Sequence, residues 1–215
     1  MFRQDRTNPS TAVSNWKGRK DTARGWPSTA VSTWLNGGLF GIAEDFQALL
    51  STAVGSDSST VTLTSAGSAE AWTSFQDLLL ISSVRVTTSG TSGGVEARLN
   101  ADSSNYSTEY LYSDASSGTG ARDNPTGARI DFATRSSAAA DEFGCAISVF
   151  GDINSSRYKT VQTMGGADVN GAGQVGQLVT IWRDTDAVTS IEIRDAGGNN
   201  IAADSRFDLY GLRTA

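Results

Sequence analysis

Three tyrosines carry the clearest candidate binding chemistry in the sequence. Tyr106, Tyr110 and Tyr112 share one parity within a segment rich in strand-forming residues, so a β-strand there would project all three from the same face. Aromatic rings on one face of a strand can stack on sugar rings, or they can fill a hydrophobic core. We therefore treat the three tyrosines as possible glycan-contact residues, with the core as the alternative.

Catalytic and metal chemistry has few residues to draw on. The sequence has no histidine and a single cysteine, Cys145, so the most common general base is missing and no intrachain disulfide can form. Cys145 stands in an apolar run and is expected to be buried. Paired carboxylates for glycoside hydrolysis would have to come from scattered acidic residues that are typical of a solvated surface: Glu96, Glu109, Asp131, Asp141, Glu142 and Glu192. We expect no catalytic residues, no metal site and no cofactor, and hence a protein that is not an enzyme.

One formal motif match fails in its context. Residues 171–176 fit the glycine pattern of dinucleotide-binding proteins, and Asp195 follows at about the right distance. That motif must open a helix, whose N-terminus binds the pyrophosphate, but the residues after it, 177–182, have the composition of a strand. The sequence therefore does not predict a nucleotide site.

A repeated peptide marks the N-terminal segment. Pro9–Trp16 recurs as Pro27–Trp34 with seven of eight positions identical and an offset of 18 residues. Two short copies cannot stack into a solenoid, so the repeat favours docking twice into equivalent pockets of a partner. Packing of both copies on the chain's own domain is the alternative. The expected docking anchors are the proline, valine and tryptophan of each copy: Pro9, Val13, Trp16, Pro27, Val31 and Trp34.

The charge of the chain is divided between its two ends. Residues 1–40 contain six basic and two acidic residues, about +4, and the remaining 11 basic and 21 acidic residues give residues 41–215 about −10. A basic segment on an acidic body favours contact with an acidic surface, and we add Arg19, Lys20 and Arg24 to the expected docking residues. The modest charge favours a protein partner over nucleic acid. No apolar stretch reaches the roughly 18 residues of a membrane span, so we expect no membrane contact either.

Hydrophobic periodicity predicts how the chain is organised. Apolar residues at three- and four-residue steps predict a connector helix over 39–55, between an extended docking arm over 1–38 and a β-sandwich over 56–215. The body shows short runs of alternating, β-branched and aromatic residues separated by turn formers. The predicted strands are Thr60–Thr64, Leu78–Thr87, Val95–Asn100, Tyr106–Tyr112, Arg129–Ala133, Cys145–Phe150, Tyr158–Met164, Val175–Trp182, Val188–Arg194 and Ser205–Leu212. This pattern predicts an all-β, jelly-roll-like sandwich with an N-terminal arm and one short helix.

An ordered series of short motifs gives the body a family resemblance. The series consists of Phe75–Leu80, Ala97–Tyr106, Tyr158–Val161, Thr180–Trp182, Ala187–Ile193 and Phe207–Leu212. In its order and spacing the series resembles a widespread group of bacteriophage virion proteins with a jelly-roll-like domain, found among decoration, tail and fibre components. The resemblance covers roughly residues 50–213 and leaves the arm out.

The resemblance implies a structural or binding role in a virion assembled in the host bacterial cytoplasm. The first expectation is a capsid decoration or cement protein that docks on the major capsid protein through its arm and self-associates as a homotrimer. The second is a tail fibre or tail adaptor that contacts tail proteins and whose β domain contacts host glycan. A carbohydrate-active enzyme is a third alternative, from a different class.

Overall fold

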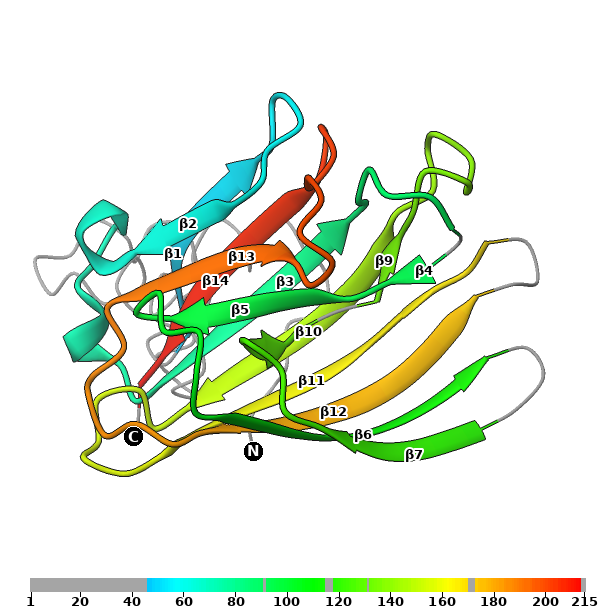
Figure 1. The fold of residues 1–215 in the computed structure, drawn as a ribbon. Coiled ribbons are helices and arrows are strands. Elements are labelled where there is room, and N and C mark those ends of the chain that lie inside the picture. The colour runs from blue at the N-terminus through cyan, green and yellow to red at the C-terminus, as the bar shows by residue number, and fades with distance from the viewer. Residues whose placement is uncertain (1–45, 91, 115–117, 131, 170–172, 214–215) are drawn as a thin grey trace, which may run out of the picture. The chain divides into compact units, whose positions relative to one another are not determined.

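The computed structural model describes residues 46–90, 92–114, 118–130, 132–169 and 173–213, which form β-strands joined by turns (Figure 1). Within these ranges the chain forms 14 strands: β1 Phe46–Ala53, β2 Val61–Thr64, β3 Asp77–Val84, β4 Ser92–Gly93, β5 Val95–Leu99, β6 Tyr106–Asp114, β7 Gly118–Asp123, β8 Ala128–Arg129, β9 Ala133–Thr134, β10 Gly144–Gly151, β11 Lys159–Ala167, β12 Gln174–Trp182, β13 Ser190–Asp195 and β14 Arg206–Leu212. Short 3-10 turns lie at Ser65–Gly67 and Trp72–Ser74. None of the helical segments in these ranges has the length and hydropathy that a membrane span needs.

The strands form two packed sheets and one small ribbon. The larger sheet has eight strands in the order β1-β14-β3-β10-β11-β12-β6-β7, the smaller has four in the order β2-β13-β5-β8, and β4 pairs with β9. The chain passes directly between the two sheets at β1/β2, β2/β3, β5/β6, β7/β8, β12/β13 and β13/β14, as in a jelly-roll-like sandwich. It also passes between them by way of β4, from β3 to β5, and by way of β9, from β8 to β10. The predicted all-β sandwich is confirmed.

Most of the predicted strands are present. Nine of the ten predicted runs each overlap one strand, and the tenth, Arg129–Ala133, overlaps the ends of β8 and β9. Three strands were not predicted. Of these, β7 has the sequence Gly-Thr-Gly-Ala-Arg-Asp, which offers no hydrophobic alternation, and β4 contains only two residues.

The predicted connector helix is wrong over Phe46–Ala53, which form β1, and residues 39–45 lie outside the described residues. β1 pairs antiparallel with β14, so the sandwich begins before residue 56. A register shift between Ala48 and Leu50 leaves Leu49 as the extra residue of a β-bulge, with its side chain buried. Phe46 is 39% exposed whereas Leu49 is buried, so the three-residue spacing that predicted a helix joins side chains on opposite faces of a strand.

The core lies between the two sheets and contains several large aromatic side chains. Trp72, Phe150, Trp182 and Phe207 are each at most 1% exposed. Burial of each such side chain stabilises the fold by about 2–3 kcal/mol. Cys145, expected in the core, is exposed because β10 alternates and its neighbour Ala146 faces inward instead.

The turn between β5 and β6 is fastened to the segment that joins β12 and β13. Asn100 has a φ of 53°, and its side-chain oxygen accepts a hydrogen bond from the backbone of Thr189 at 2.8 Å while its side-chain nitrogen donates to the carbonyl of Ala187 at 2.9 Å. In the same turn Asp102 accepts a hydrogen bond from the indole nitrogen of Trp182 at 2.7 Å. Burial alone would raise the pKa of the Asp102 carboxyl, but the bonds donated to it outweigh burial and lower the pKa. The turn thus connects the two sheets.

Asn100 allows a test of this connection. We expect Asn100→Ala to lower the free energy of unfolding by about 2 kcal/mol. The substitution removes the side-chain hydrogen bonds, and alanine at this positive φ has no such bonds to offset the strain of the backbone. Asn100→Gly should cost about half as much, since glycine tolerates the backbone conformation. The exposed Asn124→Ala is the control and should change stability by no more than about 0.5 kcal/mol in chemical denaturation. Equal stabilities of the Asn100→Ala and Asn124→Ala variants would refute the connection.

Candidate functional site

The larger sheet extends beyond the smaller sheet that covers it. Figure 1 shows the far ends of β6, β7 and β12 running past the start of β5. Along β6, Tyr106, Tyr110 and Tyr112 lie on the inner face, but they meet different surroundings. Tyr106 is 3% exposed, whereas Tyr110 and Tyr112 are half-buried beside a second, smaller hydrophobic cluster. The three tyrosines that were predicted as one glycan-contact set therefore lie in two different environments, the core and the edge of the smaller cluster.

Tyr106 belongs to the core and is removed from the candidate site. Its hydroxyl accepts a hydrogen bond from the backbone of Leu99 at 2.8 Å, and its ring stacks on Trp182 with 6.3 Å between centroids. Burial raises the pKa of the Tyr106 hydroxyl above its ordinary value. The core alternative is thus the right one for this tyrosine.

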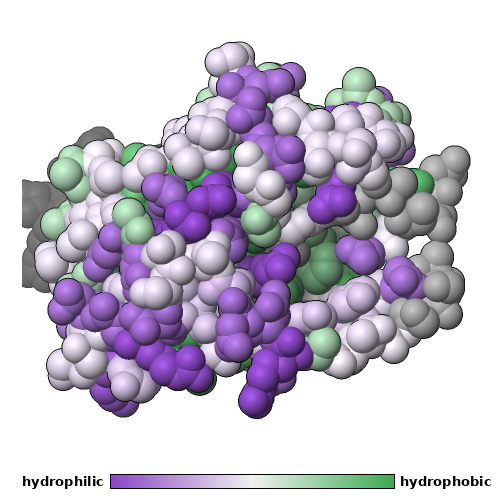
Figure 2. Space-filling view, in the orientation of Figure 1, coloured by the Kyte–Doolittle hydropathy of each residue, from purple (hydrophilic) through white to green (hydrophobic). Residues whose placement is uncertain are grey.

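Tyr110 and Tyr112 line a cleft with a volume of about 260 Å³. Figure 2 shows a hollow with an apolar floor between hydrophilic side chains. The lining residues come from β4, β6, β8, β12 and the segments next to β5 and β9: Gly93, Gly94, Tyr110, Tyr112, Arg129, Phe132, Arg135, Gln174 and Leu178. This cleft is the candidate functional site.

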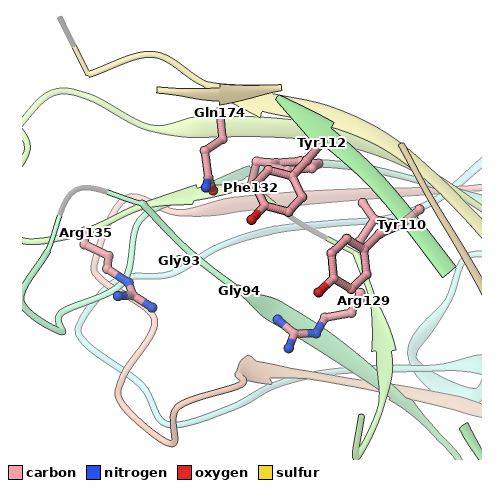
Figure 3. A pocket seen from close by; sticks show the side chains of 9 residues that line it. Gly93, Gly94, Tyr110, Tyr112, Arg129, Phe132, Arg135 and Gln174 are labelled. Atoms are coloured by element: carbon pink, nitrogen blue, oxygen red, sulfur yellow. The ribbon is translucent and has the colours of Figure 1, made fainter. Parts of the chain in front are cut away.

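Two consecutive glycines make room for two guanidinium groups. A Cβ at Gly93 would overlap the guanidinium of Arg135, and a Cβ at Gly94 would overlap that of Arg129. Both arginine side chains therefore pack directly against the backbone at the start of β5. Figure 3 shows the two guanidinium groups turned toward the same space as the hydroxyl groups of Tyr110 and Tyr112.

A third glycine shapes the floor of the cleft. Gly176 of β12 lies opposite Tyr112 of β6. A Cβ at Gly176 would lie 2.7 Å from the ring of Phe132 and 2.6 Å from the carbonyl oxygen of Leu111. The Phe132 ring therefore rests on the bare backbone of β12, and Leu178, 7% exposed, completes the apolar floor.

The two arginines differ in their partners. Arg129 forms an ion pair with Asp123, with 3.1 Å between Nη2 and Oδ2. Arg135 forms no ion pair within the described part of the chain, and its Nε is buried without a hydrogen-bond partner. Leaving a buried donor unsatisfied costs about 1–3 kcal/mol. The cleft therefore holds one positive charge that a ligand can neutralise.

Of the acidic residues considered for catalysis, Asp131 lies outside the described residues, Asp141 and Glu142 are adjacent in the chain, and Glu96 and Glu192 both lie within 4 Å of Arg98. Glu96 is 2% exposed, accepts a hydrogen bond from Thr126 and lies 3.5 Å from Arg194. Glu109 pairs with Arg122 on the outer face of β6. No carboxylate lines the cleft within the described ranges, and no cluster of three metal-ligating side chains occurs there. The arrangement offers aromatic rings, amide and hydroxyl groups, and positive charge, which are the means of binding a ligand.

The expected docking anchors of the arm lie outside the described residues. All nine precede residue 46: Pro9, Val13, Trp16, Arg19, Lys20, Arg24, Pro27, Val31 and Trp34. Sequence reasoning missed Arg129, Phe132, Arg135 and Gln174. The sequence signal for these residues was weak. It consisted of Arg129 and Arg135 on either side of a short apolar run, and of the pair Gly93-Gly94 before a predicted strand.

Comparisons with protein-family models, curated proteins and solved structures find no match.

Gly176 tests the construction of the cleft. We expect Gly176→Ala to lower the free energy of unfolding by about 1–3 kcal/mol, because the new methyl group meets backbone on one side and the Phe132 ring on the other. Gly118→Ala on β7 is the matched control, since a Cβ there meets nothing within 4 Å, and thermal unfolding should show at most a small change. A Gly176→Ala variant as stable as the wild type would show that the ring does not rest on β12 as described.

Proposed function

We propose that this chain is a structural protein of a bacteriophage virion, in the first instance a capsid decoration or cement protein. Its N-terminal arm docks on the major capsid protein, and its sandwich domain self-associates, as a homotrimer, on the surface of the shell. The observation that carries the proposal is the twofold Pro-x-x-x-Val-x-x-Trp peptide in the segment that precedes the β-sandwich in the sequence. The chain divides at Asp45/Phe46, and the sandwich belongs to the unit Phe46–Thr214.

The structural roles of the motif residues support the family resemblance. Asn100 and Asp102, from the motif Ala97–Tyr106, connect the β5–β6 turn to Trp182 and Thr189, which belong to two later motifs of the series. Residues far apart in the sequence thus form one hydrogen-bonded junction. A series of motifs with such a shared role is expected of a domain family in which the sandwich is retained while its surfaces vary.

The closing motif has a similar role. Phe75, in the first motif, packs its ring on Gly211 in the Leu-Tyr-Gly strand, where any Cβ would overlap the ring. The Arg213 guanidinium covers the same ring, 4.9 Å from its centroid. The first and last motifs are therefore in direct contact, as expected if the series describes one domain.

A tail fibre or tail adaptor is the second candidate, and the cleft is the observation that favours it. Tyr110 and Tyr112 are two of the residues expected to contact glycan, and their ring centroids lie 5.7 Å apart at the edge of an accessible hollow. In this version the arm inserts into tail proteins and the cleft contacts host glycan. A large number of copies per particle would favour decoration, and a small number would favour the tail.

Tryptophan substitutions in the arm test attachment to the particle. We expect Trp16→Ala combined with Trp34→Ala to reduce the copies per virion at least about tenfold, because both docking anchors are lost while the sandwich keeps its fold. Trp26→Ala is the matched control, since it removes an arm tryptophan outside the repeated position. Quantitative mass spectrometry of purified particles measures the copies, and cryo-EM locates them on head or tail. Wild-type incorporation of the double variant would contradict the docking role.

A further inference from the structure

We propose that the cleft binds the carboxylate group of an acidic saccharide, with Arg135 as the charged anchor. The inference deepens the glycan-contacting version of the proposed function and rests on it. It names the class of ligand, a uronic or sialic acid residue, and the side chain that distinguishes it from a neutral sugar.

The cleft carries positive charge on an acidic domain. Residues 41–215 contain 21 acidic and 11 basic residues, so the domain as a whole repels anions. The cleft nevertheless has two guanidinium groups in its wall, and only Arg129 has an acidic partner, Asp123, within the described ranges. An anion that binds this domain must therefore be recognised locally, and the cleft provides the unneutralised charge.

The side chain of Arg135 packs against glycine residues in the wall of the cleft. Because residue 93 is glycine, no side chain lies between the Arg135 guanidinium and the strand backbone. The Nε of Arg135 is buried and has no hydrogen-bond partner in the described structure. Gly90, at a φ of 118°, would bring a Cβ within 3.1 Å of the Arg135 Cδ, so a second glycine accommodates the stem. The side chain is thus held against the wall before any ligand arrives. A guanidinium is planar and offers parallel N–H donors that suit the two oxygens of a carboxylate.

The neighbours of Arg135 favour a sugar over a simple anion. Figure 3 shows the Tyr112 hydroxyl and the Gln174 amide facing the space in front of the two arginines. Hydroxyl and amide groups can each donate and accept hydrogen bonds, as the hydroxyls of a sugar require. The Tyr110 ring supplies an apolar face for the C–H side of a pyranose, and about 260 Å³ is at the lower end of small-molecule sites, suited to one or two sugar units.

The test uses the purified full-length chain and paired probes. Oligogalacturonate and a sialylated oligosaccharide are each compared with a carboxyl-reduced counterpart, so that the members of a pair differ only in the carboxylate. We expect calorimetry or a glycan array to show at least about tenfold tighter binding to the acidic member of at least one pair. Arg135→Gln should remove that preference, whereas Arg157→Gln should not, because Arg157 pairs with Asp152 at the surface, between β10 and β11, and does not line the cleft.

Each other outcome counts against the inference. Binding that does not distinguish the members of each pair, or that survives Arg135→Gln, would overturn the role of the carboxylate and of Arg135. Absence of binding to every acidic probe would overturn the ligand class, and poly-glutamate binding as tight as that of the saccharides would point to an acidic protein surface instead. Unfolding curves of the variants confirm that they are folded. None of these results bears on attachment to the virion, which the arm variants test separately.

Discussion

The unequal width of the two sheets is the constraint on which the rest of the structure depends. Eight strands form one layer and four form the other, so the smaller sheet covers only part of the larger inner face. Where the sheets overlap, side chains such as Trp182 and Tyr106 are fully enclosed and stabilise the fold. Farther along, β6 and β12 continue with the same alternation, and Tyr110 and Tyr112 face inward into the cleft, where Arg129 at the edge of the smaller sheet also lies. Core and cleft are therefore successive parts of one surface.

Small residues decide what occupies the uncovered part. Gly93 and Gly94 let two guanidinium groups lie against backbone, and Gly176 lets Phe132 lie on β12. Two guanidinium groups line the cleft beside its apolar side chains, and complete burial of such charged groups without enough partners would be costly. The Nε of Arg135, which is buried without a hydrogen-bond partner, already incurs part of this cost. Packing and recognition are thus linked: the guanidinium that packs its Nε against the strand backbone is also the group with which a ligand can pair through the other N–H donors.

The sequence predicts the fold better than the site, for a physical reason. Alternation is a local property, so strands such as β12 and β14 are visible in the sequence, whereas the apolar residues of β1 are spaced as in a helix and β7 lacks apolar alternation. Alternation also places Tyr106, Tyr110 and Tyr112 on one face. Which of them is covered depends on strand register and on the reach of the opposite sheet, which are long-range properties. Only tertiary packing brings Arg129 and Arg135 close to the tyrosines, so no local sequence pattern predicts that these arginines belong to the site.

The central claim, that the uncovered part of the larger sheet is a ligand-binding surface, is tested most directly by a crystal structure of the full chain with its best-binding acidic oligosaccharide. The account predicts electron density in the cleft, with the carboxylate within hydrogen-bond distance of the Arg135 guanidinium and a sugar ring against Tyr110 or Tyr112. An empty cleft with the saccharide ordered elsewhere on the domain would contradict it. So would a ligand in the cleft with its carboxylate turned away from both arginines.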